Sequence, residues 1–392
     1  MKKLFLHFIF ISIFAHLHVT TFAQDSSHLR ISLLTCTPGE ELYSTFGHSA
    51  FRIIDSSKAF NDSWRDAVYN YGTFNFDDDG FYLKFVQGKL LYYVSPENFV
   101  DFKELYQSTN RGITEQVLNL TAAEKVSIQS FLNNNLKEEN KYYKYDSFFD
   151  NCTTRLRDIL KKQHDSAFTQ IAVMPAGSSF RQAIHQYLDK NNKDWSKLGI
   201  DILLGKPCDG IMTAANMQFL PDNLMKSLDS SHPMVVTSQN LYPITNENAK
   251  GSFFTPFVVF SLLAIFIVLI GYAKNRFAQA FLQGFDGLFF FLTGLLGIIL
   301  IFMWFGTDHS MTKNNFNLLW AWPTHTIMAF FVNAKKSWVQ KYFKFTAVAL
   351  LAVLISWFFL PQQMNNGLIP IILLLIYRSV KKSFAAMVSR PV

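Results

Sequence analysis

The feature that most constrains this chain is the concentration of its apolar residues after Phe253. Five apolar runs follow one another there, over residues 253–272, 285–305, 318–332, 345–360 and 368–377. The first, second and fourth reach or approach the ~20 residues that a helix needs to cross a bilayer. The third and fifth are shorter, and a buried helix of a soluble core is the alternative for these two. Their apolar neighbours favour an all-α transmembrane domain of about five helices over residues 253–378.

Basic residues indicate how these spans are oriented, because Lys and Arg are enriched in cytoplasmic loops. They follow the first, third and fifth runs, whereas the alternate loops, 306–317 and 361–367, contain one Lys between them. The basic residues are Lys274, Arg276, Lys335, Lys336, Lys341, Lys344, Arg378, Lys381, Lys382 and Arg390. The first span therefore enters from outside, and residues 379–392 form a cytoplasmic tail. This distribution accounts for the net charge of +7 without a nucleic-acid partner.

The first 23 residues are typical of a secretory signal peptide. Two lysines at positions 2 and 3 precede a short apolar run, and Ala23 supplies the small residue at the end. An uncleaved anchor is the alternative, but the run is short for a span. No cysteine follows the run, so the chain is not marked as a lipoprotein. Signal peptide and loop charges agree in placing residues 24–250 outside the membrane.

The exported region, 24–250, has the pattern of an α+β domain. Residues 48–54 and 67–74 alternate like strands, and 81–86 and 90–94 are strand or helix candidates. Thr121 and Glu124 form a capping box that begins a helix, and 178–188 is also helical in pattern. The polar stretch 239–252 resembles a linker into the membrane. We expect a small antiparallel sheet with helices packed on it.

Cys152 follows Asp150 and Asn151 at the predicted first turn of a helix, where either residue can cap the free backbone N–H groups. The positive end of the helix dipole favours the thiolate, and Arg155 and Arg157 add positive charge nearby. This setting suits a nucleophile. A buried structural cysteine is the alternative, since free Cys is among the most buried residue types.

The chain has three cysteines, and an odd number in an oxidising compartment leaves at least one free thiol. Cys36 and Cys208 both lie in turn-like segments, so a disulfide between them that leaves Cys152 free is one arrangement. Sequence does not supply the distance that such a bond requires.

A cysteine nucleophile needs a base, which is usually histidine. His48 is the strongest candidate, because Gly47 lets the backbone turn just before the predicted strand. A surface loop histidine is the alternative reading. Three other histidines lie in polar or helical contexts and are weaker candidates: His164, His185 and His232.

A third group usually orients the imidazole. Asn70, on the strand that is expected to lie beside it, is the candidate, with Tyr71 behind it. A strand asparagine or tyrosine that merely pairs or packs is the alternative.

We expect no metal and no other cofactor. The chain has no Cys-x-x-Cys, no His-x-x-x-His and no clustered histidines at ligand spacing. The acidic stretch 77–80 lacks the alternating ligands and distal glutamate of a calcium loop, so it is interpreted as a solvated turn.

Three segments, 36–50, 69–76 and 150–158, together resemble the Lnb N-terminal periplasmic domain. The resemblance implies a permuted NlpC/papain-like fold in which histidine precedes cysteine, as His48 precedes Cys152. It also implies a lipoprotein N-acyltransferase of the inner membrane, with its exported domain in the periplasm. A phospholipid would donate the acyl chain, and a lipid-modified apolipoprotein would accept it. Substrate-binding residues are then expected at Tyr43, Ser49, Tyr71 and Asn151.

Polar residues also occur in the membrane part. Asp308, His309 and Asn315 lie in the outer loop 306–317, and His325 lies within the third apolar run. Polar groups at membrane depth usually face a bundle interior or a site, so these four residues are candidates for a lipid headgroup pocket. An ordinary wet loop with a histidine near the interface is the alternative.

The sequence therefore favours a membrane-bound acyltransferase with Cys-His catalysis. A membrane-anchored cysteine hydrolase acting on cell-wall peptides or lipid esters is the second hypothesis, and a non-enzymatic membrane scaffold is the third. Five spans exceed what tethering a hydrolase requires, whereas a lipid substrate accounts for them. The cysteine at a helix start, with Gly47-His48 upstream, argues against a scaffold.

Overall fold

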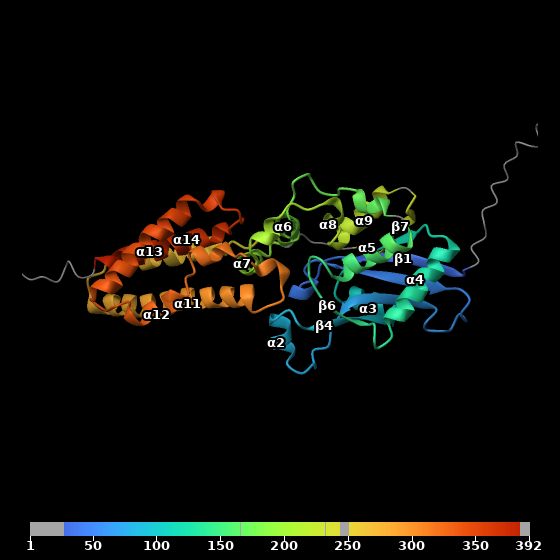
Figure 1. Ribbon diagram of the computed structural model, residues 1–392, viewed down its shortest axis with the longest axis horizontal. Helices are drawn as coiled ribbons and strands as arrows, with labels where there is room; N and C mark the ends of the chain where they lie inside the picture. The colour runs from blue at the N-terminus through green and yellow to red at the C-terminus, as the bar shows by residue number, and fades with distance from the viewer. Residues whose placement is uncertain (1–26, 165, 232, 244–250, 385–392) are drawn as a thin grey trace, which may run out of the picture.

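A computed structural model of the chain describes residues 27–164, 166–231, 233–243 and 251–384. The expected signal peptide lies outside these ranges, as do His232, residues 244–250 of the expected linker and residues 385–392 of the expected tail. The described chain forms two bodies that lie end to end, a sheet with its helices and a bundle of helices (Figure 1). The first contains the exported region and the second the apolar region.

The exported region is built on a seven-stranded antiparallel sheet with the order β6-β4-β3-β2-β1-β5-β7. This confirms the α+β class and the antiparallel sheet. The strands expected at 48–54 and 67–74 are β2 and β3, and most of 90–94 lies in β4. The bounds are β1 Leu29–Cys36, β2 His48–Asp55, β3 Asp66–Thr73, β4 Leu91–Asn98, β5 Ile113–Leu118, β6 Tyr142–Lys144 and β7 Val235–Tyr242.

Strand β7 includes four residues that the sequence assigned to the linker. Gln239 pairs with Glu115 of β5, and the pairing continues to Tyr242 opposite Ile113. The side chains of β7 are mostly exposed, so this edge strand has no apolar alternation to reveal it. The linker prediction is therefore wrong at residues 239–242.

Helices cover both faces of the sheet (Figure 1). Leu33 and Phe51 share a core with residues of α4, α5 and α9, whereas Leu34 and Ala50 pack with residues of α3. Alternate strand residues point to opposite faces, which explains why neighbours in one strand join different cores. The helices of this region are α2 Phe81–Val86, α3 Phe99–Ser108, α4 Ala122–Asn135, α5 Cys152–Gln163, α6 Phe180–Lys190, α7 Asp194–Leu203, α8 Ala214–Met217 and α9 Pro221–Ser230.

Two of these helices match expected helix starts. The capping box between Thr121 and Glu124 begins α4, and a second one between Ser179 and Gln182 begins α6. The segment 81–86, which the sequence left between strand and helix, is the short helix α2.

The apolar region forms the helices α10 Pro256–Ile270, α11 Arg276–Phe305, α12 Thr324–Met328, α13 Ser337–Ile355 and α14 Ile369–Ser383. Within the described residues, α11 and α13 are long and apolar enough to cross a membrane, and α10 is a shorter apolar helix. The C-terminal end of α14 lies at the end of the molecule farthest from the sheet (Figure 1). The orientation of these helices in the membrane stays a prediction.

The third apolar run, 318–332, is not one continuous spanning helix. It contains the short helix α12 between two 3-10 turns, 316–319 and 329–331. Pro323 has no backbone N–H and stands at the N-cap of α12, so helix cannot run through it from the preceding segment. All five apolar runs contain helix, but the third is helical only in part, so a count of five membrane-spanning helices stays a prediction.

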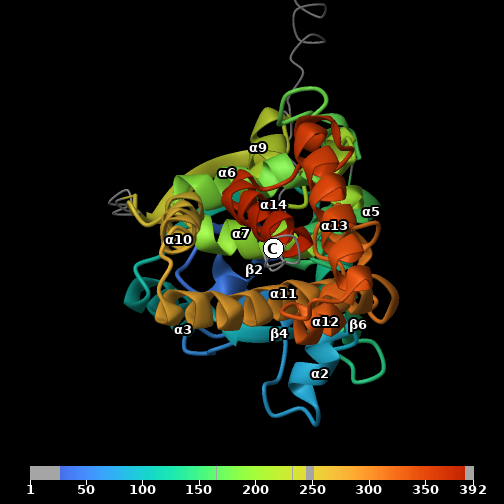
Figure 2. The same cartoon turned by 90° about the vertical axis from the view of Figure 1, so that its left-hand side faces the viewer.

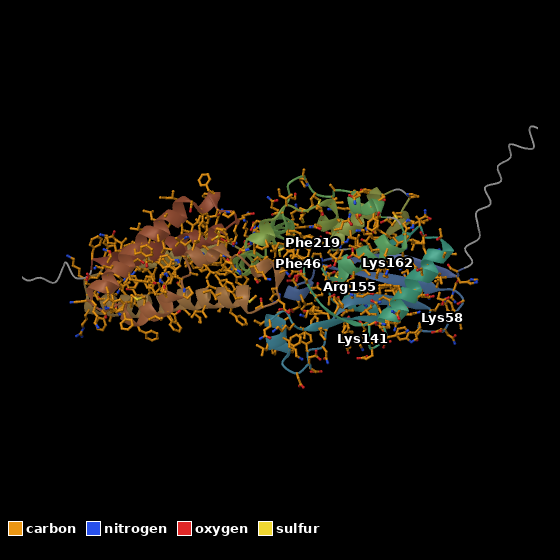
Figure 3. The ribbon with its side chains drawn as sticks, in the orientation of Figure 1. Phe46, Lys58, Lys141, Arg155, Lys162 and Phe219 are labelled. Atoms are coloured by element: carbon orange, nitrogen blue, oxygen red, sulfur yellow. The ribbon has the colours of Figure 1, made fainter. Side chains whose placement is uncertain are left out.

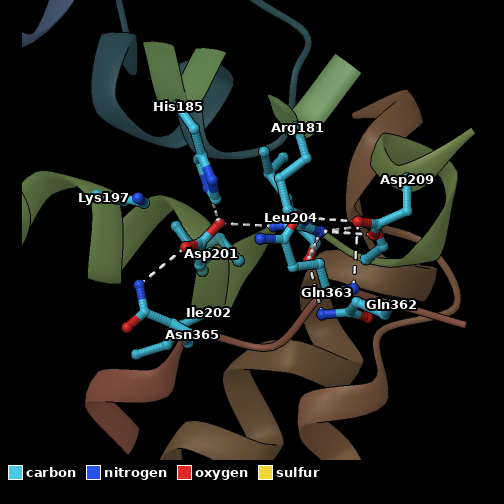
Figure 4. Close-up of polar contacts among 12 residues, drawn as sticks. Arg181, His185, Lys197, Asp201, Ile202, Leu204, Asp209, Gln362, Gln363 and Asn365 are labelled. Atoms are coloured by element: carbon cyan, nitrogen blue, oxygen red, sulfur yellow. Dashed lines mark hydrogen bonds and ion pairs between the residues drawn. The ribbon is translucent and has the colours of Figure 1, made fainter. Parts of the chain in front are cut away.

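A buried polar network joins the two bodies (Figure 4). Arg181 of α6 is fully buried and binds Asp201 Oδ1 at 2.8 Å and Asp209 Oδ1 at 2.9 Å. Asn365, in the loop between α13 and α14, donates to Asp201 Oδ2 at 2.8 Å. Buried charges are stable only when they are paired, so this network fixes the outer loop 361–367 against α6 and α7.

The outer loop 306–317 makes a second junction. Gly205 N donates to Met311 O at 2.8 Å, and a Cβ at Gly205 would collide with the carbonyl of Lys313. Asn315 donates to the carbonyls of Ile202 and Leu203, which lie just before Gly205 in the chain. Glycine thus permits a close backbone approach between the exported domain and the membrane helices.

Candidate active site

Cys152 is the first residue of α5. Asn151 caps the helix by accepting from Thr154 N at 2.8 Å, whereas Asp150 pairs with Arg155 at 2.6 Å. Asn151 also donates to the carbonyl of Ser147 and, across the core, to that of Phe219. The start of the helix is therefore fixed from both sides, and the predicted apolar stripe behind it is buried: Leu156, Ile159 and Leu160.

His48 is the first residue of β2, on which α5 packs. Gly47 has a φ of 81°, and a Cβ there would meet the carbonyl oxygen of Cys36. The turn before His48 thus needs glycine, as the sequence suggested. His48 Nε2 donates to Asn70 Oδ1 at 3.0 Å, and its imidazole also hydrogen-bonds the thiol of Cys152.

Glu97 extends this chain of contacts. Asn70 Nδ2 donates to Glu97 Oε1 at 2.6 Å. A carboxylate accepts but does not donate, so it selects the amide orientation in which Oδ1 faces His48. Asn70 pairs with Ser95 in the sheet, which puts Glu97 two residues further along the same face of β4. The resulting order is thiol, imidazole, amide and carboxylate.

The electrostatics favour a thiolate–imidazolium pair. Burial opposes ionisation of Cys152, but attraction to His48, its hydrogen bond and the N–H of Ser49 lower the pKa of the thiol to about 7. Burial likewise disfavours the imidazolium, yet the contacts with Cys152 and Asn70 raise the pKa of His48. Each group thus stabilises the charged form of the other. This is the arrangement that a cysteine nucleophile requires.

The site lies at the end of the exported domain that faces the membrane helices. In Figure 3, Phe46, Phe219 and Arg155 lie toward that end, and Lys58 lies toward the opposite one. The segment before Cys152 is tied to the membrane domain, since Ser310 of the outer loop donates to Asp146 Oδ2 at 2.6 Å. The other carboxylate oxygen of Asp146 accepts from the N–H groups of Phe148 and Phe149. Asp146 therefore connects the loop that positions the thiol to the outer end of α11.

Two family comparisons cover most of the chain. Residues 18–188 match the Lnb N-terminal periplasmic domain, and residues 247–389 match the Lnb transmembrane domain. The chain belongs to the Lnb family. It is accordingly a membrane protein with a periplasmic domain. No curated protein and no solved structure matches the chain. The permuted NlpC-like fold therefore stays a prediction.

The thiol, imidazole, amide and carboxylate of this site all lie within the Lnb N-terminal domain. Sequence analysis did not identify Glu97, which supplies the carboxylate. Glu97 follows Pro96 near the end of β4, and only the register between β3 and β4 brings it to Asn70. Thr153 was also missed; its hydroxyl lies 3.1 Å from the hydroxyl of Ser49. Neither has a local sequence signal, because both depend on contacts between distant segments.

The expected substrate-binding residues of the Lnb domain lie in different environments. Tyr43 is 72% exposed, whereas Ser49 and Tyr71 are buried, and Tyr71 donates its hydroxyl proton to Asn135. The side chain of Asn151 already accepts from Thr154 N and donates to the carbonyls of Ser147 and Phe219. The exposed Tyr43 is thus the one of these four that is open to a ligand, and their role in binding stays a prediction.

The alternative histidines in the described part of the chain have other partners. His164 Nδ1 lies 2.7 Å from Glu124, and His185 Nε2 lies 2.8 Å from Asp201 in the junction network. Neither contacts the thiol of Cys152 in the way His48 does. The geometry therefore favours His48 as the base.

The four polar residues of the Lnb transmembrane domain do not form one pocket. Asp308 pairs with Lys144 at 2.8 Å, and His309 lies 3.1 Å from the carbonyl of Val86. Asn315 holds the junction beside α7, whereas His325 is buried among the helices against Tyr342. Three of them thus join the two domains. A direct contact of any of the four with lipid stays a prediction.

Cys36 and Cys208 do not form a disulfide: all three cysteines are free and buried. Cys36 packs with Phe102 and Tyr106, whereas Cys208 belongs to a separate core with Met212. The proposed pairing is therefore wrong, because the fold places the two thiols in different cores. Burial raises the pKa of each to about 12, so neither competes with Cys152 as a nucleophile.

Within the described ranges, no group of three or more His, Cys, Asp or Glu side chains has the geometry to hold a metal ion. The acidic stretch 77–80 is a largely exposed turn that leads into α2. The groups that surround Cys152 supply a nucleophile and a base from protein side chains alone.

Proposed function

We propose that this Lnb-family chain is a multi-pass inner-membrane acyltransferase. It moves a fatty acyl chain from a phospholipid, through a thioester on Cys152, to the N-terminal amine of a diacylglyceryl-cysteine lipoprotein. The observation that carries the proposal is the Cys152–His48–Asn70 arrangement at the membrane-facing end of the exported domain. Membership of the Lnb family supports a lipoprotein-modifying enzyme.

The first half of the reaction forms the acyl-enzyme. The thiolate of Cys152 attacks the ester carbonyl of the phospholipid, and the bond from that carbonyl to the glycerol oxygen breaks. The imidazolium of His48 protonates the departing alkoxide, which leaves as a lysophospholipid. His48 is then neutral, and Cys152 carries the acyl group as a thioester.

The second half transfers the acyl group to nitrogen. The acceptor amine attacks the thioester, its proton passes to neutral His48, and the carbon–sulfur bond breaks. The products are an amide and the original thiolate–imidazolium pair. The oxyanion of each tetrahedral intermediate forms beside the start of α5, where the first backbone N–H groups have no partner within the helix.

Mass spectrometry of lipoprotein N-termini tests the proposal in cells. Lipoproteins from cells with the wild-type protein should carry an N-acyl chain, and those from cells with Cys152→Ala should have a free α-amine. Cys208→Ala is the matched control, since Cys208 is also a buried free thiol and should leave N-acylation intact. Unchanged N-acylation in the Cys152→Ala strain would refute the proposal. Free fatty acid without any N-acylated product would favour the hydrolase.

A further inference from the structure

Helix α2 presents a group of large apolar side chains to its surroundings. Tyr82 is 80% exposed, Leu83 61% and Phe85 50%, and Phe76 in the preceding turn is also exposed. The function proposed above does not use them. Soluble surfaces rarely expose apolar side chains as a contiguous group, so this helix is expected to meet an apolar partner.

The contacts of α2 place it beside the loop that follows the apolar helix α11. Asp308 N donates to Gln87 O at 2.8 Å, and His309 Nε2 donates to the carbonyl of Val86. Both donors belong to the loop that directly follows α11, which ends at Trp304 and Phe305. Tryptophan and other aromatic side chains gather where a bilayer meets water. Helix α2 contacts residues that follow Phe305 by only a few positions, so it is expected to lie near the boundary between bilayer and water.

Figure 2 views the molecule from the end of the membrane helices. Helix α2 lies outside the outline of α10, α11, α12, α13 and α14 in this view. The membrane helices therefore do not overlie α2, whose side chains are exposed, and in a bilayer lipid would occupy the space beside the bundle. Lys84 and Lys89 are exposed on and just after the same helix, and their ammonium groups match the phosphates of lipid headgroups.

A line of aromatic rings leads from α2 toward the nucleophile. The ring of Phe81 lies 5.9 Å from that of Phe74, Phe74 lies 5.3 Å from Tyr92, and Tyr92 stacks on Tyr145 at 4.5 Å. We call these four residues the aromatic track. Phe74, Tyr92 and Tyr145 are partly exposed, so their rings offer an apolar surface to a chain that lies along them.

The aromatic track ends beside Cys152. Gly72, with a φ of 94°, lies between Tyr145 at the end of the track and Cys152. A Cβ at Gly72 would be 3.4 Å from the ring of Tyr145 and 3.8 Å from Cys152 Cβ. Any larger residue would place a side chain in this space. Glycine therefore leaves the end of the track open to the thiol.

We propose that the exposed side chains of α2 lie among the acyl chains of outer-leaflet phospholipids, and that the aromatic track guides one acyl chain from there to Cys152. The first part is independent of catalysis. The second part rests on the proposed function, and it adds the path by which the acyl chain of the phospholipid donor enters the site.

Fluorescence quenching tests the first part without any reaction. Leu83→Cys in a Cys152→Ala background is labelled with the fluorophore NBD and reconstituted in phosphatidylcholine vesicles, where the two remaining cysteines are buried. Lipids that carry a nitroxide on the acyl chain should quench NBD at position 83. The control is Val126→Cys on α4, which is 47% exposed and lies away from the membrane helices (Figure 1). Equal quenching at positions 83 and 126 would overturn this part.

Acylation of Cys152 by two donors tests the second part. One donor is a long-chain phospholipid in vesicles, and the other is a water-soluble short-chain p-nitrophenyl ester. Leu83→Asp should lower the ratio of phospholipid to soluble-ester acylation about tenfold or more, since burying a leucine contributes at least about one factor of ten. Val126→Asp should keep the wild-type ratio. A further variant, Gly72→Val, tests the other end of the track. Its side chain would fill the space between Tyr145 and Cys152, so it should also lower the ratio of phospholipid to soluble-ester acylation.

The outcomes separate the two proposals. An unchanged ratio in Leu83→Asp, together with lipid quenching at position 83, would overturn the path along the track. If neither donor acylates the wild-type protein at Cys152, the proposed function fails, and with it the path. The quenching at position 83 then still decides whether α2 lies in lipid.

Discussion

Removing the imidazole of His48 should change how Cys152 ionises. The thiol has a pKa of about 7 although burial opposes ionisation, and His48 is the main group that lowers it from 9.0. In His48→Ala the pKa should return to 9 or above. The thiolate fraction at pH 7 then falls from about one half to about 1%, a loss of roughly 50-fold. A more basic thiolate is a better nucleophile, by about 0.45 log units per pKa unit, which offsets roughly eightfold of that loss.

Alkylation measures this effect without a substrate. The purified protein in lipid nanodiscs is treated with iodoacetamide between pH 5 and 10, and modification of each cysteine is followed by peptide mass spectrometry. The rate at Cys152 should rise with pH through an inflection near 7 in the wild type and at 9 or above in His48→Ala. At pH 7 the net loss should be about sixfold. Cys36 and Cys208 are internal controls, since burial raises their pKa to about 12.

A second control tests whether the loss of any histidine has this effect. His164→Ala removes an imidazole that binds Glu124 and not Cys152, so the inflection should stay near 7. The reasoning is refuted if His48→Ala leaves the inflection of Cys152 near pH 7. It is also refuted if His164→Ala moves the inflection as far as His48→Ala does.

Three further predictions follow from the contacts. Asn70→Ala removes the acceptor for His48 and should lower the acyl-transfer rate about 10- to 100-fold in a kinetic assay, because hydrogen bonds to charged groups contribute about 1.5–3 kcal/mol; a rate within twofold of wild type would contradict an orienting role. Arg181→Ala removes the buried guanidinium that pairs with Asp201 and Asp209 and should destabilise the protein by about 3–5 kcal/mol, seen as a lower midpoint in thermal unfolding; an unchanged midpoint would show that the network contributes little. A reporter active only in the cytoplasm should work when fused after Val392 and fail when fused after Asn246, and the reverse pattern would overturn the orientation.

Local patterns in the sequence identified the parts of the fold that depend on near neighbours. The cap and apolar stripe of α5, the capping box of α4 and the strand that begins at His48 are all encoded within a few residues. The residues His48, Asn70 and Cys152 were also identified as a candidate site from residue type and local context. The structure brings these three side chains together.

Features that depend on pairing between distant segments were missed. Glu97 reaches Asn70 only through the register of β3 and β4, and β7 is an edge strand with exposed side chains. The disulfide prediction failed because turn-like flanks say nothing about which core a cysteine joins. In the membrane part, hydropathy alone did not show that Pro323 breaks the third run.

The central claim is that Cys152 carries the acyl group as a thioester. Its most direct test is incubation of the purified protein with a radiolabelled or isotope-labelled phospholipid in the absence of any acceptor lipoprotein. The account predicts one acyl group on Cys152, which neutral hydroxylamine releases, and no adduct in Cys152→Ala. Acyl transfer to a lipoprotein by the Cys152→Ala protein, or an acyl group found on Cys36 or Cys208 instead, would contradict it.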